Sequence, residues 1–304
     1  MVDTSVKLCD IQLKNPVIPA SGTFGFGHEF AHWYDLNVLG AICLKGTTKD
    51  PRFGNETPRI AEAPAGMLNA VGLQNPGIEA VLETELPALR KLYSGPVIAN
   101  ISGFSKEEYV FCCEKADQSP HVDIIEVNIS CPNVQSGGMS FGASAKDAGE
   151  ITKAVRAVCK KPIFMKLTPN VTDIAEIARA CEANGADGIS LINTLLAMRI
   201  DIKNRKPVLA NTTGGLSGPA VFPVALRMVW QVYKAVKLPI IGMGGVSCPE
   251  DVVEMMLAGA TAVQVGASNL QNPFACPEII DGLPPLLERL GVSRIAELIG
   301  AAHY

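Results

Sequence analysis

The 304-residue sequence lacks the features of a membrane-bound, secreted or nucleic-acid-binding protein. No apolar run reaches the roughly 18 residues that a transmembrane helix needs. The N-terminal stretch "MVDTSVKLCD" has neither the basic patch nor the apolar stretch of a signal peptide, so we expect a cytoplasmic protein. The formal net charge of −4 disfavours a nucleic-acid surface. With 48% hydrophobic and 18% charged residues, the composition is that of a globular chain with a large core.

Motifs that hold metals or dinucleotides are also missing. The nine cysteines contain no C-x-x-C pair, which argues against a disulfide framework and against a structural zinc or iron–sulfur site. Neither the G-x-G-x-x-G fingerprint nor a Walker loop occurs. "HEFAH" at residues 28–32 does match the H-E-x-x-H pattern of zinc proteases. A catalytic zinc needs a third protein ligand, and the other histidines, His121 and His303, lie beside a proline and next to the C-terminus. We therefore expect an exposed helical turn there and no metal.

The sequence does contain a repeated alternation of short apolar runs and amphipathic segments. Ile174, Ile177, Ala178 and Cys181, for example, have the i, i+3, i+4, i+7 spacing of one helical face. Continuous apolar runs indicate strands that are buried on both faces of a parallel sheet. The eight runs cover residues 16–20, 41–45, 96–100, 124–128, 163–167, 188–193, 239–243 and 262–266.

This pattern predicts an α/β fold, a (β/α)8 TIM barrel, with a doubly wound sheet as the alternative. A short β-hairpin over "SVKLCDIQLKN" is expected to precede the first strand, and inserted loops are expected at the C-terminal face of the strands. Because no linker or change of composition divides the chain, we expect residues 1–304 to form one domain.

Polar residues stand at the ends of most of these runs. They are Ser21, Lys45, Asn100, Asn128, Lys166 and Asn193. The C-terminal ends of barrel strands converge on the active site, although a polar residue at any single position can equally cap the next helix. A lysine at the end of a buried strand must keep its charge paired or solvated. We therefore expect Lys45 and Lys166 to face a ligand with anionic or electron-rich oxygens.

Two glycine-rich stretches follow the last two runs, "GMGGV" at residues 242–246 and "VGASN" at residues 265–269. The loops after strands seven and eight are where TIM barrels often bind a phosphate with backbone N–H groups. Glycine permits this close approach, but it also serves ordinary tight turns. The paired location favours phosphate binding, and a mononucleotide-like ligand such as FMN fits better than a dinucleotide.

Longer motifs resemble those of the dihydroorotate dehydrogenases. They are "ASGTFGFG", "KGTT", "RFGNETPR", "MLNAVGLQNPG", "NISCPNV", "KLTPNVTDI", "NTLLAMRID", "ANTTGGLSGPA" and "PIIGMGGV", and together they extend from about Leu13 to Pro277. Within that family, "KGTT", "AVGLQNPG" and "TGGLSGPA" resemble the catalytic FMN subunit of the class 1B, NAD-linked enzymes. The resemblance implies oxidation of (S)-dihydroorotate to orotate in de novo pyrimidine (UMP) biosynthesis. A fumarate-dependent class 1A enzyme, a related FMN-dependent pyrimidine reductase and a non-catalytic phosphate-binding barrel remain alternatives.

The family's chemistry gives a role to the thiol of "EVNISCPNV". Oxidation of dihydroorotate removes a proton from ring carbon five and a hydride from ring carbon six, and the hydride goes to FMN. By resemblance, Cys131 is the general base that takes the proton. An ordinary thiol, with a pKa of about 8.5, is much nearer to neutrality than a serine hydroxyl.

The resemblance also implies which residues bind the two ligands. The substrate-binding residues are Lys45, Asn69, Ala70, Val71, Gly72, Leu73, Asn128, Asn193 and Thr194. The FMN-binding residues are Ser21, Lys45, Gly46, Asn100, Asn128, Lys166, Ile192, Gly218, Gly244, Gly245, Gly266 and Ala267. The chain departs from the family at Ala197, where a glycine is frequent, so the resemblance does not fix the conformation of the long loop 194–217.

An NAD-linked enzyme needs redox groups for which this sequence has no motif. The resemblance therefore implies a partner electron-transfer subunit with FAD and a [2Fe–2S] cluster. It also implies a homodimer of this chain within a heterotetramer.

Overall fold

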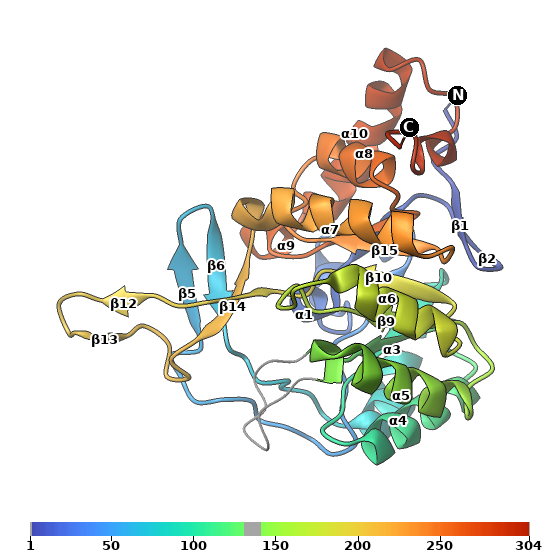
Figure 1. Ribbon diagram of the computed structural model, residues 1–304. Coiled ribbons are helices and arrows are strands. Elements are labelled where there is room, and N and C mark those ends of the chain that lie inside the picture. The colour runs from blue at the N-terminus through green and yellow to red at the C-terminus, as the bar shows by residue number, and fades with distance from the viewer. Residues whose placement is uncertain (1, 131–140, 304) are drawn as a thin grey trace.

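The computed structural model describes residues 2–130 and 141–303, and its centre is an eight-stranded parallel sheet rolled into a barrel (Figure 1). Hydrogen-bonded neighbours follow the order β3, β16, β15, β10, β9, β8, β7, β4. The strands are β3 (Val17–Pro19), β4 (Ile42–Cys43), β7 (Val97–Ile101), β8 (Ile124–Asn128), β9 (Ile163–Lys166), β10 (Gly188–Leu191), β15 (Ile240–Met243) and β16 (Ala262–Val265). Each overlaps one of the eight apolar runs, which confirms the predicted TIM barrel.

The two outer strands of this order, β3 and β4, lie side by side and nearly close the barrel. The amide of Gly40, just before β4, donates to the carbonyl of Val17 in β3 (3.0 Å). The register of β7, β8 and β9 pairs residue 100 with 126 and residue 128 with 166. Glu126 of β8 also contacts Gln264 of β16, four strands away in the order. These polar side chains therefore point into the barrel interior.

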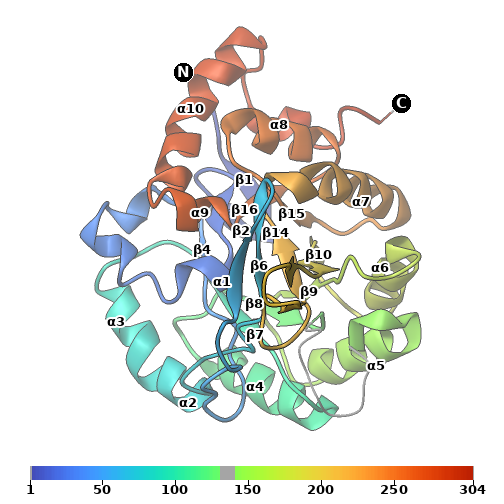
Figure 2. The ribbon, with the colours of Figure 1, turned by 90° about the vertical axis from the view of Figure 1, so that its left-hand side faces the viewer.

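Helices surround the barrel, as Figure 2 shows. They are α1 (Ser21–Phe24), α2 (Ile78–Ala80), α3 (Leu86–Arg90), α4 (Lys106–Gln118), α5 (Ala145–Arg156), α6 (Ile174–Ala183), α7 (Phe222–Ala235), α8 (Pro249–Leu257), α9 (Ser268–Gln271) and α10 (Ala275–Arg289). Side chains of Ser105, Ser144 and Asp173 cap α4, α5 and α6 by accepting from backbone amides of the first turn. The predicted apolar face over residues 174–181 is buried in α6.

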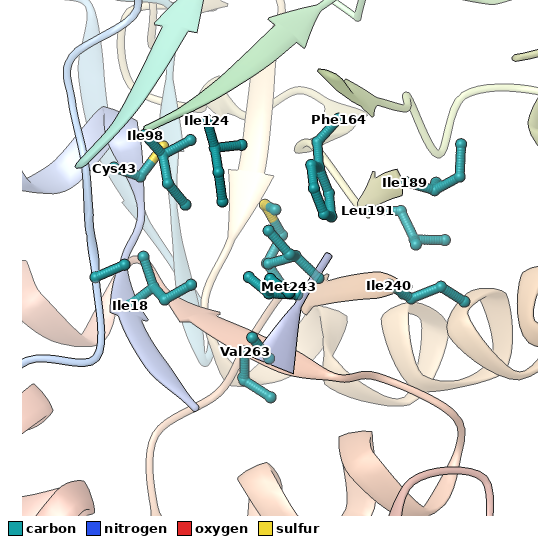
Figure 3. Close-up of a cluster of buried hydrophobic side chains, with 14 of the residues drawn as sticks. Ile18, Cys43, Ile98, Ile124, Phe164, Ile189, Leu191, Ile240, Met243 and Val263 are labelled. Atoms are coloured by element: carbon teal, nitrogen blue, oxygen red, sulfur yellow. The ribbon is translucent and has the colours of Figure 1, made fainter. Parts of the chain in front are cut away.

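The predicted N-terminal hairpin is present as β1 (Val6–Leu8) and β2 (Ile11–Leu13). Leu8 and Leu13 are fully buried, so the hairpin packs onto the barrel core. Figure 1 places it at the opposite end of the molecule from the inserted segments. Figure 3 shows part of the core, in which Phe164, Ile98 and other side chains from the barrel strands pack together.

The inserted segments contain more structure than the predicted loops. β5 (Ile60–Ala63), β6 (Gly66–Asn69), β11 (Leu195–Ala197) and β14 (Gly214–Ser217) form a four-stranded antiparallel sheet in the order β11, β14, β6, β5. β12 (Ile200–Asp201) and β13 (Lys206–Pro207) extend from it as a separate hairpin (Figure 1). Leu68, Ala70 and Leu209 form a small buried cluster beneath this sheet. The insertions therefore make a second wall over the C-terminal end of the barrel.

Candidate functional site

A cavity of about 310 Å³ lies between the C-terminal ends of the barrel strands and the inserted sheet. Its wall includes nearly all the described residues that the sequence predicted for the site. They are Ser21, Lys45, Gly46, Asn69, Val71, Gly72, Leu73, Asn100, Asn128, Lys166, Ile192, Asn193, Thr194, Gly218, Gly244, Gly245, Gly266 and Ala267. These residues come from separate segments of the chain between positions 21 and 267, and the fold brings them together.

Among the described residues, one predicted site residue is not on this wall. Ala70 is fully buried; its amide donates to the carbonyl of Arg59 (2.8 Å), and its carbonyl accepts from Asn55 (2.9 Å). Its backbone groups are therefore engaged within the insertion. Cys131 lies outside the described residues.

The cavity also has lining residues that were not among the predicted site residues. They are Ala20, Gly22, Thr23, Ile60, Met67, Leu216, Ser217, Val221, Met243 and Leu270. Ile60, Met67 and Leu216 belong to the inserted sheet and give the cavity an apolar side. An apolar residue does not by itself indicate a binding site in a sequence. Only the pairing of β5, β6 and β14 turns these three side chains toward the barrel.

Two asparagines at the end of the barrel are held in fixed orientations by a hydrogen-bonded chain. The Oδ1 atom of Asn128 accepts from the amide (3.2 Å) and the hydroxyl (2.7 Å) of Ser130. The Nδ2 group of Asn193 donates to the same hydroxyl oxygen (2.5 Å), and its Oδ1 atom accepts from the Thr194 amide (2.9 Å). Since Oδ1 of Asn128 is occupied, its Nδ2 group is the part that can donate to a ligand.

Lys166 and Asn100 form the polar floor of the cavity. The Nζ atom of Lys166 lies 3.5 Å from Oγ of Ser21 and 3.7 Å from Oε1 of Glu126. The Nδ2 group of Asn100 donates to the same Glu126 oxygen (2.7 Å). The Oδ1 atom of Asn100 is buried and has no hydrogen-bond partner among the described residues. It is therefore an acceptor available to a ligand in the cavity.

The two glycine-rich loops lie on the same wall. Gly244 and Gly245 have φ angles of +125° and +77°, which side chains rarely tolerate. A Cβ atom at Gly244 would lie 2.8 Å from Cβ of Ala225. At Gly266, by contrast, it would meet only Cβ of Ala20, at 3.8 Å, and both residues line the cavity. The backbone at Gly266 therefore borders open space that a side chain would enter.

Burial makes three of the described cysteines weaker acids than an ordinary thiol. Burial raises the pKa of Cys9 to about 11 and that of Cys112 to about 12. Burial, and then the nearby Glu126 carboxylate, raise the pKa of Cys43 well above its ordinary range. None of these three residues lines the cavity.

The "HEFAH" segment takes part in ordinary side-chain contacts. Nε2 of His28 lies 2.9 Å from a carboxylate oxygen of Glu85, and residues Phe30–His32 form a short helical turn. Within residues 2–130 and 141–303, no three His, Cys, Asp or Glu side chains gather as a metal site would require. Over the same residues, no helix has the length and apolarity needed to cross a membrane.

Comparison with known proteins gives one consistent family. The sequence model described as "Dihydroorotate dehydrogenase" matches residues 3–287. A protein of Enterococcus faecalis named "Dihydroorotate dehydrogenase B (NAD(+)), catalytic subunit" is 56% identical over 295 residues, covering 97% of this chain and 95% of that protein. Proteins with the same name from Geobacillus kaustophilus and Bacillus pumilus are each 57% identical over 296 residues. Both alignments cover 97% of this chain. They cover 94% of the Geobacillus kaustophilus protein and 95% of the Bacillus pumilus protein.

Proposed function

The chain belongs to the dihydroorotate dehydrogenase family, and from that premise we propose that it oxidises (S)-dihydroorotate to orotate in pyrimidine biosynthesis. The observation that carries the proposal is the set of residues that line the cavity described above. Two lysines, four asparagines and two glycine-rich loops from separate strand ends line one space of about 310 Å³. This combination suits a flat, oxygen-rich substrate beside a phosphate-bearing cofactor.

The residues of the cavity fit FMN, the cofactor of this family. Asn100 supplies a buried acceptor without a partner, and Lys166 supplies a buried ammonium at the floor. Gly244, Gly245 and Gly266 give a backbone wall without side chains, as a phosphate site needs. We infer that residues 1–304 form one FMN-binding barrel domain, in which the glycine loops hold the phosphate. FMN bound there supplies a two-electron acceptor for the hydride of the substrate.

The remaining polar residues orient the substrate. Asn69, Asn128, Asn193 and Thr194 offer donors and acceptors in a fixed pattern, and the network through Ser130 holds two of these amides before the substrate arrives. Ile60, Met67 and Leu216 form an aliphatic side of the same cavity. We propose that Cys131, which lies outside the described residues, is the general base that takes the proton from ring carbon five.

We propose further that the electrons leave through a partner subunit with FAD and a [2Fe–2S] cluster, within a heterotetramer built on a dimer of this chain. The proteins from Enterococcus and Geobacillus are named catalytic subunits of NAD(+)-linked enzymes, which supports such a partner. A cytoplasmic location remains a prediction from the N-terminal sequence.

The test is anaerobic addition of dihydroorotate to the purified, FMN-loaded chain while the visible absorption of the flavin is recorded. We expect the flavin band to bleach and orotate to form in equal amount. A band that persists, with FMN still bound, would remove dihydroorotate as the substrate. The Cys131→Ala variant is the matched comparison: it should retain FMN but be reduced far more slowly, and wild-type kinetics in that variant would overturn the role of Cys131.

A further inference from the structure

Glu126 lies at the centre of a polar network beneath the cavity. It is the middle residue of β8, its exposure is 0%, and it does not line the cavity itself. Its Oε1 atom accepts from Asn100 (2.7 Å) and from the Cys43 thiol (3.3 Å). Its Oε2 atom accepts from Nε2 of Gln264 (3.0 Å). The carboxylate thus joins β4, β7, β8 and β16 inside the barrel.

A wholly buried carboxylate is tolerated only where a positive charge and hydrogen bonds compensate it. The ammonium of Lys166, 3.7 Å away and 5% exposed, is the cation that the described structure provides at contact distance. Lys45 lines the same cavity, and the Cys43 thiol is the other titratable group that faces the carboxylate. The pair is therefore mutually dependent, because each charge lacks water and has the other as its counter-charge.

We propose that Glu126 is a positioning residue that holds the Lys166 ammonium at the floor of the cavity and leaves the Asn100 carbonyl oxygen for a ligand. By accepting from Nδ2 of Asn100, Glu126 leaves Oδ1 of that amide for a ligand. Lys166 is held between Glu126 and Ser21, a second residue of the cavity wall. The inference rests on the proposed function, since it concerns how the floor of the FMN cavity is charged.

The Glu126→Gln substitution removes the charge and preserves the shape. The Oε1 atom of Gln264 is buried and has no hydrogen-bond partner among the described residues, so this amide can turn and accept from the new Gln side chain. The oxygen of that side chain can still accept from Asn100. The predicted change is therefore electrostatic, because Lys166 loses the carboxylate that is its counter-charge.

The experiment measures the midpoint potential of bound FMN at pH 7, using a chemical reductant and a reference dye. We expect the potential of the Glu126→Gln variant to differ from that of the wild type, because one negative charge is missing and Lys166 is no longer held by it. The same substitution in a Lys166→Gln background should shift the potential by a different amount. Equal shifts in the two backgrounds would overturn the proposal, since they would mean that Glu126 does not act through Lys166.

A control separates charge from packing. Cys43→Ala removes one contact of Glu126 without changing the charge, so the potential of bound FMN should stay at the wild-type value. A shift in Cys43→Ala as large as that in Glu126→Gln would mean that packing and not charge is responsible, and would overturn the proposal.

If Glu126→Gln does not fold, the reciprocal Lys166→Gln and Lys166→Arg variants test the same pair in the apoprotein. Lys166→Gln leaves the buried Glu126 carboxylate without its counter-charge, whereas Lys166→Arg keeps the charge. The urea midpoint should therefore fall more in Lys166→Gln than in Lys166→Arg, and equal losses would overturn the proposal. Neither measurement uses dihydroorotate, so failure of the proposed substrate and failure of this inference are distinguishable.

Discussion

Two glycines on the cavity wall give a prediction that separates ligand binding from folding. Gly266→Ala places a methyl group next to Ala20, at an ordinary contact distance of 3.8 Å, and it requires no unusual backbone angle. Gly244→Ala places the same group 2.8 Å from Cβ of Ala225 and 3.2 Å from a side-chain carbon of Ile192, at a φ of +125°. The same chemical change therefore meets open cavity at one position and packed core at the other.

The expected magnitudes differ accordingly. At Gly244, the strained backbone costs roughly 1–3 kcal/mol and the overpacking costs roughly 1–3 kcal/mol more. This sum is a large part of a total stability of roughly 5–15 kcal/mol. At Gly266 the apoprotein should be unchanged or more stable by roughly 0.4–1 kcal/mol. The methyl group should instead displace the ligand, at a cost of roughly 1–3 kcal/mol, which is roughly 5- to 150-fold in the dissociation constant of FMN.

Two assays on each variant measure these effects: urea denaturation of the apoprotein, and titration of the apoprotein with FMN followed by flavin fluorescence. Gly266→Ala should shift the titration and leave the urea midpoint unchanged, whereas Gly244→Ala should lower the urea midpoint. Wild-type FMN affinity in Gly266→Ala would show that this backbone does not approach the cofactor. An unchanged urea midpoint in Gly244→Ala would refute the argument from strain.

Three further outcomes follow from the described contacts. Tyr109→Phe removes the hydroxyl that donates to the buried carbonyl of Asn128 (2.7 Å), so the free energy of unfolding should fall by roughly 1–3 kcal/mol in urea denaturation; no change would mean that the carbonyl finds another donor. The pKa of about 11 at Cys9 predicts alkylation by iodoacetamide at pH 8 at least ~100-fold slower than at an ordinary thiol, with a rate that rises with pH as the thiolate forms. Peptide mass mapping checks this, and rapid labelling at pH 8 would contradict it. FMN at 100 times its dissociation constant should stabilise the chain by roughly 2.7 kcal/mol, measured as a rise in the denaturation midpoint that Gly266→Ala reduces.

Much of the fold could be predicted because strands buried on both faces leave unbroken apolar runs. Every barrel strand overlaps such a run, and the polar residues that follow the runs meet in one cavity, as the geometry of a barrel requires. The inserted sheet could not be predicted in the same way. Its register joins Gly215 to Asn69, 146 positions apart in the sequence, and its strand β11 has only three residues, Leu195–Ala197. No local pattern of two or three residues identifies such a strand, because the partner strand supplies the hydrogen bonds that define it.

Glu126 is a polar residue inside an apolar run, a sequence feature that the prediction of the site did not use. The prediction of the site used the polar residues at the ends of the runs, whereas Glu126 and Gln264 lie inside two of them, in "IIEVN" and "AVQVG". A strand buried on both faces has no solvated position for a carboxylate, so Glu126 must have a partner with a positive charge. The alternation of side chains in β8 places residue 126 on the same face as Asn128, which lies at the end of the strand. The sequence therefore implied a buried charge pair beneath the site, and the barrel identifies Lys166 as the partner because β9 lies next to β8.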